Sequence, residues 1–218
     1  ALSALLALGS IAAMQLLPGP GPADATRAAA RPPSLREIGT LLINKRFMTV
    51  TALAAVPAKI LLTGVCFYLV PLYIVSIGSS QSVVGRMLMT YAVVMVVLAP
   101  IAASLATSRE RMEWLVGAGL LISGLGGLLL LAGGTNAWLF ATVFLIGLGQ
   151  SLSIAAQSAL VREHCDAEVA AMGEPAVYGV FRLLERLGNA LGPLLAGVLV
   201  LMFGYRTSFV ATGALVLL

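Results

Sequence analysis

Residues 114–161 read WLVGAGLLISGLGGLLLLAGGTNAWLFATVFLIGLGQSLSIAAQSALV, 48 residues without a single ionisable acid or base. As one α-helix this stretch would be about 72 Å long, because an α-helix rises 1.5 Å per residue. The hydrocarbon core of a bilayer is only about 30 Å thick, and about 20 helical residues cross it. The stretch must therefore fold back, and residues 133–136, Gly-Gly-Thr-Asn, are its one concentrated turn signal. We predict two membrane spans, at about 114–132 and 137–160.

The rest of the chain is also too apolar for a soluble domain. Of its 218 residues, 60% are hydrophobic and 10% are charged, whereas soluble domains average roughly 45–50% apolar and 25% charged residues. Three more apolar stretches, at 47–75, 83–106 and 176–203, are long enough to cross a bilayer, and truncated ones lie at 1–17 and at the end of the chain. We predict an all-α fold, a polytopic membrane helical bundle with five complete spans and two truncated ones.

The charged residues divide the chain into three parts. Residues 1–17 are the end of a truncated span, residues 18–46 a basic linker rich in Pro, Ala and Arg, and residues 47–218 the helical bundle. With loops on alternate sides, ten of the 13 Lys and Arg residues fall on one side of the membrane. The positive-inside rule makes that side, including the linker, cytoplasmic, in a multi-pass protein of the cell (inner) membrane. Because the chain begins and stops within apolar runs, we expect a fragment of a longer protein.

Several function classes find little support in the sequence. Basic residues confined to loops between spans argue against nucleic-acid binding. Cys66 lies in a span and Cys165 in a charged loop, which gives no disulfide framework. A single His and the absence of a Gly-x-Ser-x-Gly motif leave little basis for a catalytic site, a metal or a cofactor. We predict a protein that is not an enzyme.

Lys59 is the most unusual residue, because it lies about thirteen residues into the 29-residue span at 47–75. A charged Lys near the bilayer centre costs about 2.5–3.5 kcal/mol even on a lenient insertion scale. We favour a position on a central pathway, where Lys59 binds an anionic or carbonyl-bearing substrate or pairs with a carboxylate outside this bundle. Thr63 shares its helix face, and Pro57 can loosen the helix locally. The alternatives are a lysine that snorkels to the interface and a structural ion pair.

Two further polar groups lie in or beside predicted spans. Gln150, Ser153 and Gln157 share one face of the helix at 137–160, and they either line a wet cavity or hold this helix to a neighbour. Arg182, Glu185, Arg186 and Asn189 form a compact cluster at the start of the span at 176–203. One interpretation is a cytoplasmic gate whose ion pairs break during alternating access, and the other is an interfacial anchor with local charge compensation.

The layout of spans and the sequence RLGNALGPLLAGVL at residues 186–199 resemble the second half of a major facilitator superfamily transporter. The family's loop signature, of the type Gly-x-x-x-Asp-Arg-x-Gly-Arg, should fall at residues 103–111. There Ala103 and Thr107 stand in place of Gly and Asp, so the role of that Asp is not transferred. The resemblance implies the end of the sixth span, a central loop and a carboxy-terminal six-helix bundle. It also implies a missing amino-terminal six-helix half, with substrate bound between the two halves near the membrane midplane.

We therefore predict a secondary active transporter that is embedded in the lipid bilayer and moves a small solute by alternating access. Transport would be driven by a gradient, and a proton is the first candidate for the coupling ion. The main alternative is a membrane-embedded sensory or regulatory module built on a transporter-like bundle. A third is an assembly scaffold, in which protein partners alone would satisfy Lys59.

Overall fold

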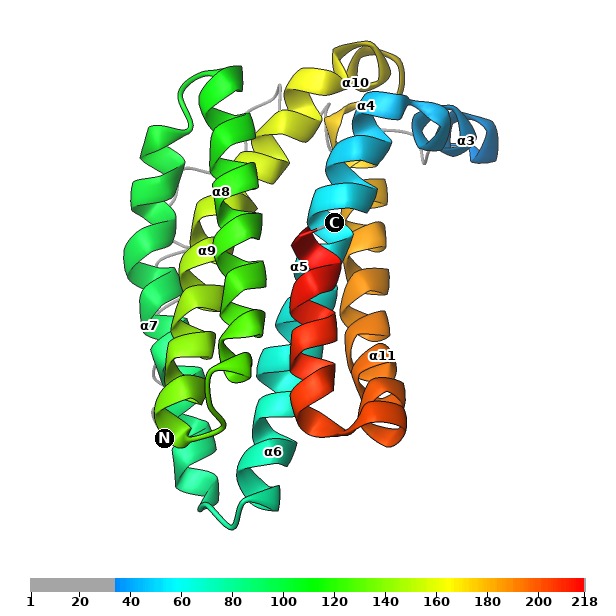
Figure 1. The fold of residues 1–218 in the computed structure, drawn as a ribbon. Helices are drawn as coiled ribbons and strands as arrows, with labels where there is room; N and C mark the ends of the chain where they lie inside the picture. Colours follow the sequence, from blue (N-terminus) through cyan, green and yellow to red (C-terminus); the bar gives the residue numbers. More distant parts are fainter. Residues whose placement is uncertain (1–33, 218) are drawn as a thin grey trace, which may run out of the picture. The chain divides into compact units, whose positions relative to one another are not determined.

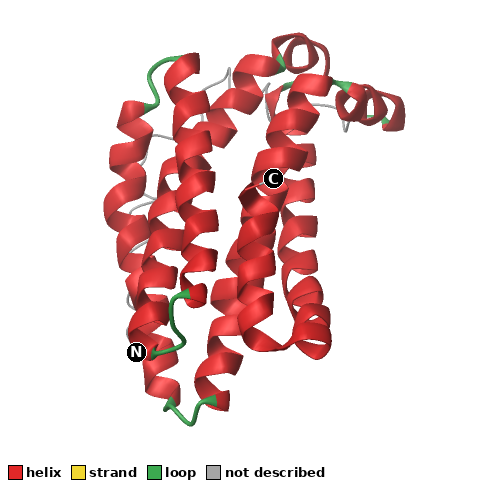
Figure 2. Ribbon diagram, viewed as in Figure 1, coloured by secondary structure: helices red, strands yellow, loops and turns green. Residues whose placement is uncertain are grey.

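The computed structural model describes residues 34–217, and every regular element in that range is a helix (Figure 2). The all-α prediction is confirmed. The truncated span predicted at 1–17 and the linker as far as residue 33 lie outside the described residues. The helices, including π-helical and 3₁₀ segments marked η, follow in this order: α3 Leu35–Ile43, α4 Lys45–Met48, η1 Thr49–Ala55, α5 Val56–Leu61, η2 Leu62–Leu69, α6 Val70–Ser76, α7 Gln81–Leu105, α8 Arg109–Leu128, η3 Leu129–Leu131, α9 Asn136–His164, α10 Asp166–Met172 and α11 Glu174–Leu217.

The first membrane helix is continuous from Lys45 to Ser76 and joins α4, η1, α5, η2 and α6. It starts two residues before the predicted span, because the side chain of Asn44 caps it by accepting the backbone N–H groups of Arg46 and Phe47. The last part of the predicted linker is itself helical: α3 begins with a capping box formed by Ser34 and Glu37.

Helix α9 packs against both α7 and α8, parallel to α7 and antiparallel to α8, while α5 and η2 pack against α11 (Figure 1). The predicted turn at 133–136 separates α8 and η3 from α9, as expected. Helices α8 and α9 approach closely at Gly119 and Gly149, where a Cβ on either residue would overlap the backbone carbonyl of the other. The uncharged stretch of the sequence therefore forms the tightest hairpin of the described bundle.

Helix α11 is two helices joined at Gly204. The backbone of Gly204 has φ 77° and ψ 172°, a conformation that residues with a side chain rarely adopt. The chain reverses there, so residues 174–203 run in one direction and residues 205–217 return along α8 (Figure 1). Gly127 and Gly213 meet at this contact, in which a Cβ on Gly127 would be 2.6 Å from Cα of Gly213. The sequence indicates a turn at residues 204–207, but in the structure only Gly204 departs from helical geometry, and the final span begins directly after it.

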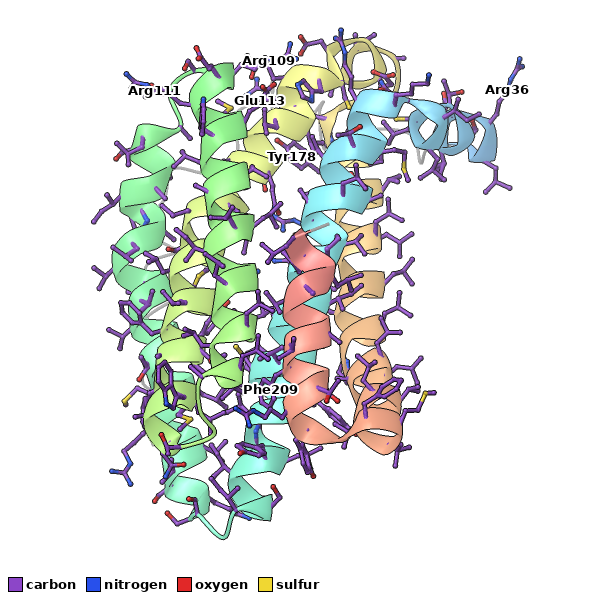
Figure 3. The ribbon with its side chains drawn as sticks, viewed as in Figure 1. Arg36, Arg109, Arg111, Glu113, Tyr178 and Phe209 are labelled. Atoms are coloured by element: carbon purple, nitrogen blue, oxygen red, sulfur yellow. The ribbon has the colours of Figure 1, made fainter. Side chains whose placement is uncertain are left out.

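The two ends of the bundle differ in chemistry. At one end, which we call the charged end, Nε2 of His164 lies 3.7 Å from Glu113, and Arg109 and Arg111 lie nearby (Figure 3). At the opposite end the Tyr73 hydroxyl donates to the carbonyl of Gly134 at 3.1 Å. Helix α9 joins the two ends with 29 residues, or about 43 Å, close to the full thickness of a bilayer with its headgroups.

Five helices in residues 34–217 are long and apolar enough to cross a membrane, and α11 counts as one of them although it turns back at Gly204. Gln150 lies halfway along α9, and its side chain reaches the backbone of Ala58. This contact places Lys59, the next residue, midway between the charged end and the opposite end. In the structure Lys59 is therefore close to the middle of its helix, Lys45–Ser76.

Candidate functional site

A buried ion pair joins two helices at the middle of the bundle. Nζ of Lys59 on α5 lies 3.4 Å from Oε1 of Glu185 on α11, and the two residues are 7% and 3% exposed. The second carboxylate oxygen, Oε2, accepts a hydrogen bond of 2.6 Å from Nη1 of Arg182. One carboxylate therefore bridges a buried ammonium and a guanidinium whose side chain is 56% exposed.

Glycines on α11 make this pairing possible. A Cβ on Gly188 would lie 2.9 Å from the carbonyl oxygen of Val56 and 3.2 Å from Cβ of Lys59. One turn further along, a Cβ on Gly192 would overlap Oγ1 of Thr63. Because neither glycine carries a side chain, α11 packs directly on the backbone of α5 and η2.

The helix around Lys59 has an unusual backbone. Lys59 lies on a short α-helical segment between two π-helical ones, η1 and η2, and Pro57 lies two residues before it. Such wide turns occur often at functional sites, since they change the hydrogen-bonding pattern of the backbone. Thr63, predicted to share the face of Lys59, donates its hydroxyl to the carbonyl of Lys59 at 2.8 Å. Pro57 is apparent in the sequence, whereas no sequence pattern predicts the π-helical segments.

The polar residues on α9 contact different neighbours. Nε2 of Gln150 donates to the carbonyl of Ala58 at 3.0 Å, so this side chain joins α9 to α5. Ser153 instead lies against α8, because its Cβ and backbone N would crowd a Cβ placed on Gly119. The predicted stripe is thus divided between two helix contacts. Oε1 of Gln150, Oγ of Ser153 and Nε2 of Gln157 are buried without a hydrogen-bond partner in residues 34–217.

The cluster predicted at the start of the span at 176–203 overlaps with the Lys59 site. Glu185 faces inward to Lys59, whereas Arg182 and Arg186 are exposed and Asn189 is half-buried. Both arginines are close enough to Lys59 to repel its ammonium. From the sequence Lys59 and this cluster are two separate features, and the structure joins them. The sequence signal that could connect them is that Lys59 and Glu185 carry opposite charges within otherwise apolar spans.

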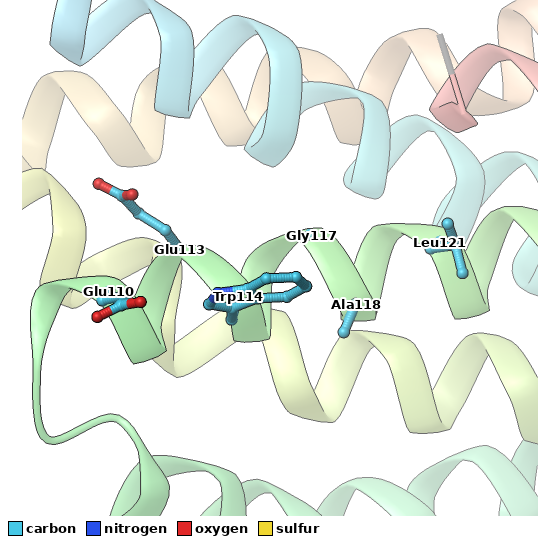
Figure 4. A pocket seen from close by; sticks show the side chains of 6 residues that line it. All are labelled: Glu110, Glu113, Trp114, Gly117, Ala118 and Leu121. Atoms are coloured by element: carbon cyan, nitrogen blue, oxygen red, sulfur yellow. The ribbon is translucent and has the colours of Figure 1, made fainter.

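Other features lie away from this ion pair. A surface groove of about 460 Å³ follows one face of α8, with Trp114, which is 73% exposed, and Glu113 at its charged end (Figure 4). None of the residues predicted for the pathway or the gate lines it.

Cys165 is a free, buried thiol between α9 and α10, and burial together with Glu168 and Asp166 raises its pKa to about 11. In residues 34–217 no group of three His, Cys, Asp or Glu side chains is placed to hold a metal ion.

Comparison with known families agrees with this membrane architecture. The model of the Major Facilitator Superfamily matches residues 1–174. The chain belongs to the major facilitator superfamily. It is therefore a multi-pass membrane protein and a secondary transporter, not an enzyme. No curated protein and no solved structure matches the chain.

Proposed function

We propose that this protein moves a small solute across the cell (inner) membrane by alternating access, and that the ion pair of Lys59 and Glu185 lies at its central site. The observation that carries the proposal is a charged pair buried at mid-depth in a member of a transporter superfamily. Ionisable groups at this depth are expensive and usually mark substrate or ion pathways. Residues 34–217 would then be the carboxy-terminal half, which works against an amino-terminal six-helix half.

The charged end is the cytoplasmic end in this proposal. It carries Arg109 and Arg111 between α7 and α8, and Arg162 at the end of α9. Cytoplasmic loops of membrane proteins carry an excess of Lys and Arg, which supports this orientation. The basic linker before residue 46 lies on the same side by the alternation of spans.

A proton is the coupling ion that fits best. Glu185 is the only buried acidic side chain in residues 34–217, and it holds both Lys59 and Arg182. Protonation of Glu185 would remove its charge and weaken both contacts, because charge-assisted hydrogen bonds are roughly twice as strong as neutral ones. The two states of the carboxylate would then favour different arrangements of α11 against α5, which is what a gate requires.

The test is a counterflow measurement with the full-length protein in proteoliposomes. Vesicles preloaded with a mixture of small metabolites are diluted into labelled solutes with and without an imposed pH gradient, and accumulation is measured by mass spectrometry. We expect accumulation of at least one solute, stimulation by the gradient, and a loss of about tenfold or more in Lys59→Gln. Arg109→Gln, which alters an exposed ion pair at the charged end, is the matched control and should keep normal transport.

A binding measurement beside the vesicle assay distinguishes a sensory module from a transporter. A sensory module would bind a solute, seen as a rise in the thermal unfolding midpoint of the purified protein, without letting it accumulate inside vesicles. Binding without accumulation would refute the transport proposal. A scaffold without a ligand would show neither effect, and Lys59→Gln would then leave only a change in stability.

A further inference from the structure

The charges around the central site do not balance. Lys59 and Arg182 both contact the carboxylate of Glu185, and a third cation, Arg186, is the next residue on α11. We infer that this site binds a small organic anion, held through a carboxylate or similar acidic group by Arg186 and by the cations that Glu185 bridges. The inference rests on the proposed transport function and names the class of its substrate.

We expect the two arginines to avoid lipid on this part of α11. Glu185 is level with Lys59, which lies at the middle of the bundle, and Arg182 and Arg186 lie within one turn of Glu185 on α11. Both are nevertheless exposed on the surface of residues 34–217. Charged side chains at mid-depth face a bundle interior or a water-filled cavity. The face of α11 that carries them must therefore border the aqueous pathway or the rest of the protein.

A cation would meet an unfavourable site. Both oxygens of Glu185 are already engaged, one by Lys59 and the other by Arg182, and the residue is 3% exposed. A cation approaching from the pathway would first encounter the exposed guanidinium groups of Arg182 and Arg186. Like charges in a partly desolvated site repel strongly, so the groups that an incoming solute meets select against positive charge.

An anion finds unused donors in the same place. In residues 34–217 Arg186 has no hydrogen-bond or ion-pair partner, and its guanidinium presents the planar fork that fits a carboxylate in two parallel hydrogen bonds. Arg182 uses one nitrogen, Nη1, for Glu185. With a net charge of +2 among these four side chains, one or two acidic groups of a solute would neutralise the site. An arriving carboxylate would also compete with Glu185 for Lys59, which links binding to the contact between α5 and α11.

The experiment offers the proteoliposomes matched solutes that differ in charge. Full-length protein is given equal concentrations of acetate, lactate, succinate and benzoate, their neutral amides, and the amines of the same carbon skeletons. We expect one or more acids to accumulate about tenfold or more above the corresponding amide and amine. Lys59→Gln and Arg186→Gln should each reduce this accumulation by a similar factor, Lys59→Arg should retain part of it, and Arg109→Gln should leave it unchanged.

The possible results separate the two proposals. Accumulation of amides or amines without the acids would overturn the anion assignment and leave the transport function intact. No accumulation of any solute, including the metabolite mixture above, would refute transport itself. The headgroup of an anionic lipid is a second anion that Arg186 could bind. The assay is therefore repeated in vesicles with and without anionic lipid. If Arg186→Gln reduces uptake only when anionic lipid is present, Arg186 binds a lipid headgroup and the assignment is wrong for that residue.

Discussion

Replacement of Glu185 by Leu should destabilise the protein far more than replacement of Lys59 by Met. Glu185→Leu leaves the ammonium of Lys59 buried without its counter-ion, since the Nζ–Oε1 contact of 3.4 Å is the ion pair that compensates it. Removal of one partner from a buried pair typically costs about 3–5 kcal/mol. An upper limit follows from lysine itself: release of a proton from a group with an ordinary pKa of about 10.4 costs about 4.6 kcal/mol at pH 7. We therefore expect a loss of about 3–4.6 kcal/mol in the free energy of unfolding.

Lys59→Met should cost less, because the carboxylate keeps its second partner. Oε2 of Glu185 still accepts the 2.6 Å hydrogen bond from Arg182, and a hydrogen bond to a charged group contributes about 1.5–3 kcal/mol. The double variant, Lys59→Met with Glu185→Leu, removes both buried charges and leaves Arg182 exposed. It should be close to wild type, since apolar replacement of a whole buried pair is often neutral or stabilising.

The assay is reversible unfolding of the full-length protein in mixed detergent micelles, followed by circular dichroism for the wild type, both single variants and the double variant. The coupling energy of this cycle should be about 2 kcal/mol or more. Arg109→Met and Glu113→Leu form the control cycle: their side chains are 50% and 51% exposed, and the coupling between them should be below about 1 kcal/mol. Equal losses for Glu185→Leu and Lys59→Met, with no coupling between them, would show that the two groups do not depend on each other.

Three further predictions follow from the packing and the thiol chemistry. Gly119→Ala should destabilise the protein by about 1–3 kcal/mol in the same assay, because its Cβ would overlap the backbone of α9. Gly117→Ala is the control on the same helix: the space around Gly117 is open, so this variant should be neutral or slightly stabilising. Gly204→Ala should cost about 1–3 kcal/mol through backbone strain alone, and a smaller effect would argue against the reversal of α11 at that residue. Cys165 should react slowly with a maleimide at pH 7, since raising its pKa from 9.0 to about 11 lowers the thiolate fraction about 100-fold. Its rate should rise with pH towards 11, and a Cys introduced at exposed Thr107 should react at the ordinary rate.

The spans could be predicted because hydrophobicity and charge are properties of each segment alone. The uncharged stretch at 114–161 is too long for one crossing, and its turn at 133–136 separates α8 and η3 from α9. At Gly204 the sequence indicates a turn, whereas in the structure the helix resumes directly after this residue. The exact ends of the helices depend on caps such as Asn44. Its side-chain contacts are local in sequence, but they form only in one backbone conformation, which the sequence does not show.

The site could be predicted only in its parts. Lys59 and Glu185 are each conspicuous as charges beside apolar sequence, yet they are 126 positions apart and belong to helices whose rotation about their own axes the sequence does not fix. The same uncertainty explains the polar stripe of α9. Gln150 and Ser153 are three residues apart and share a face by periodicity, but that face is wide enough for one to reach α5 and the other α8.

The glycine-rich sequence at 186–199 and the buried lysine are parts of one arrangement. Gly188 and Gly192 lie four residues apart, one helical turn, and both abut the backbone between Val56 and Gly64. This close approach brings Glu185, one turn before Gly188, within ion-pair distance of Lys59. A bulkier seam would move the two helices apart and leave the ammonium of Lys59 without its counter-ion in an apolar interior, which typically costs several kcal/mol. The side chains of Arg182 and Arg186, which flank Glu185 on the same helix, are exposed on the surface of residues 34–217. The motif that resembles the family's eleventh span thus supplies the packing on which the polar site of this protein depends.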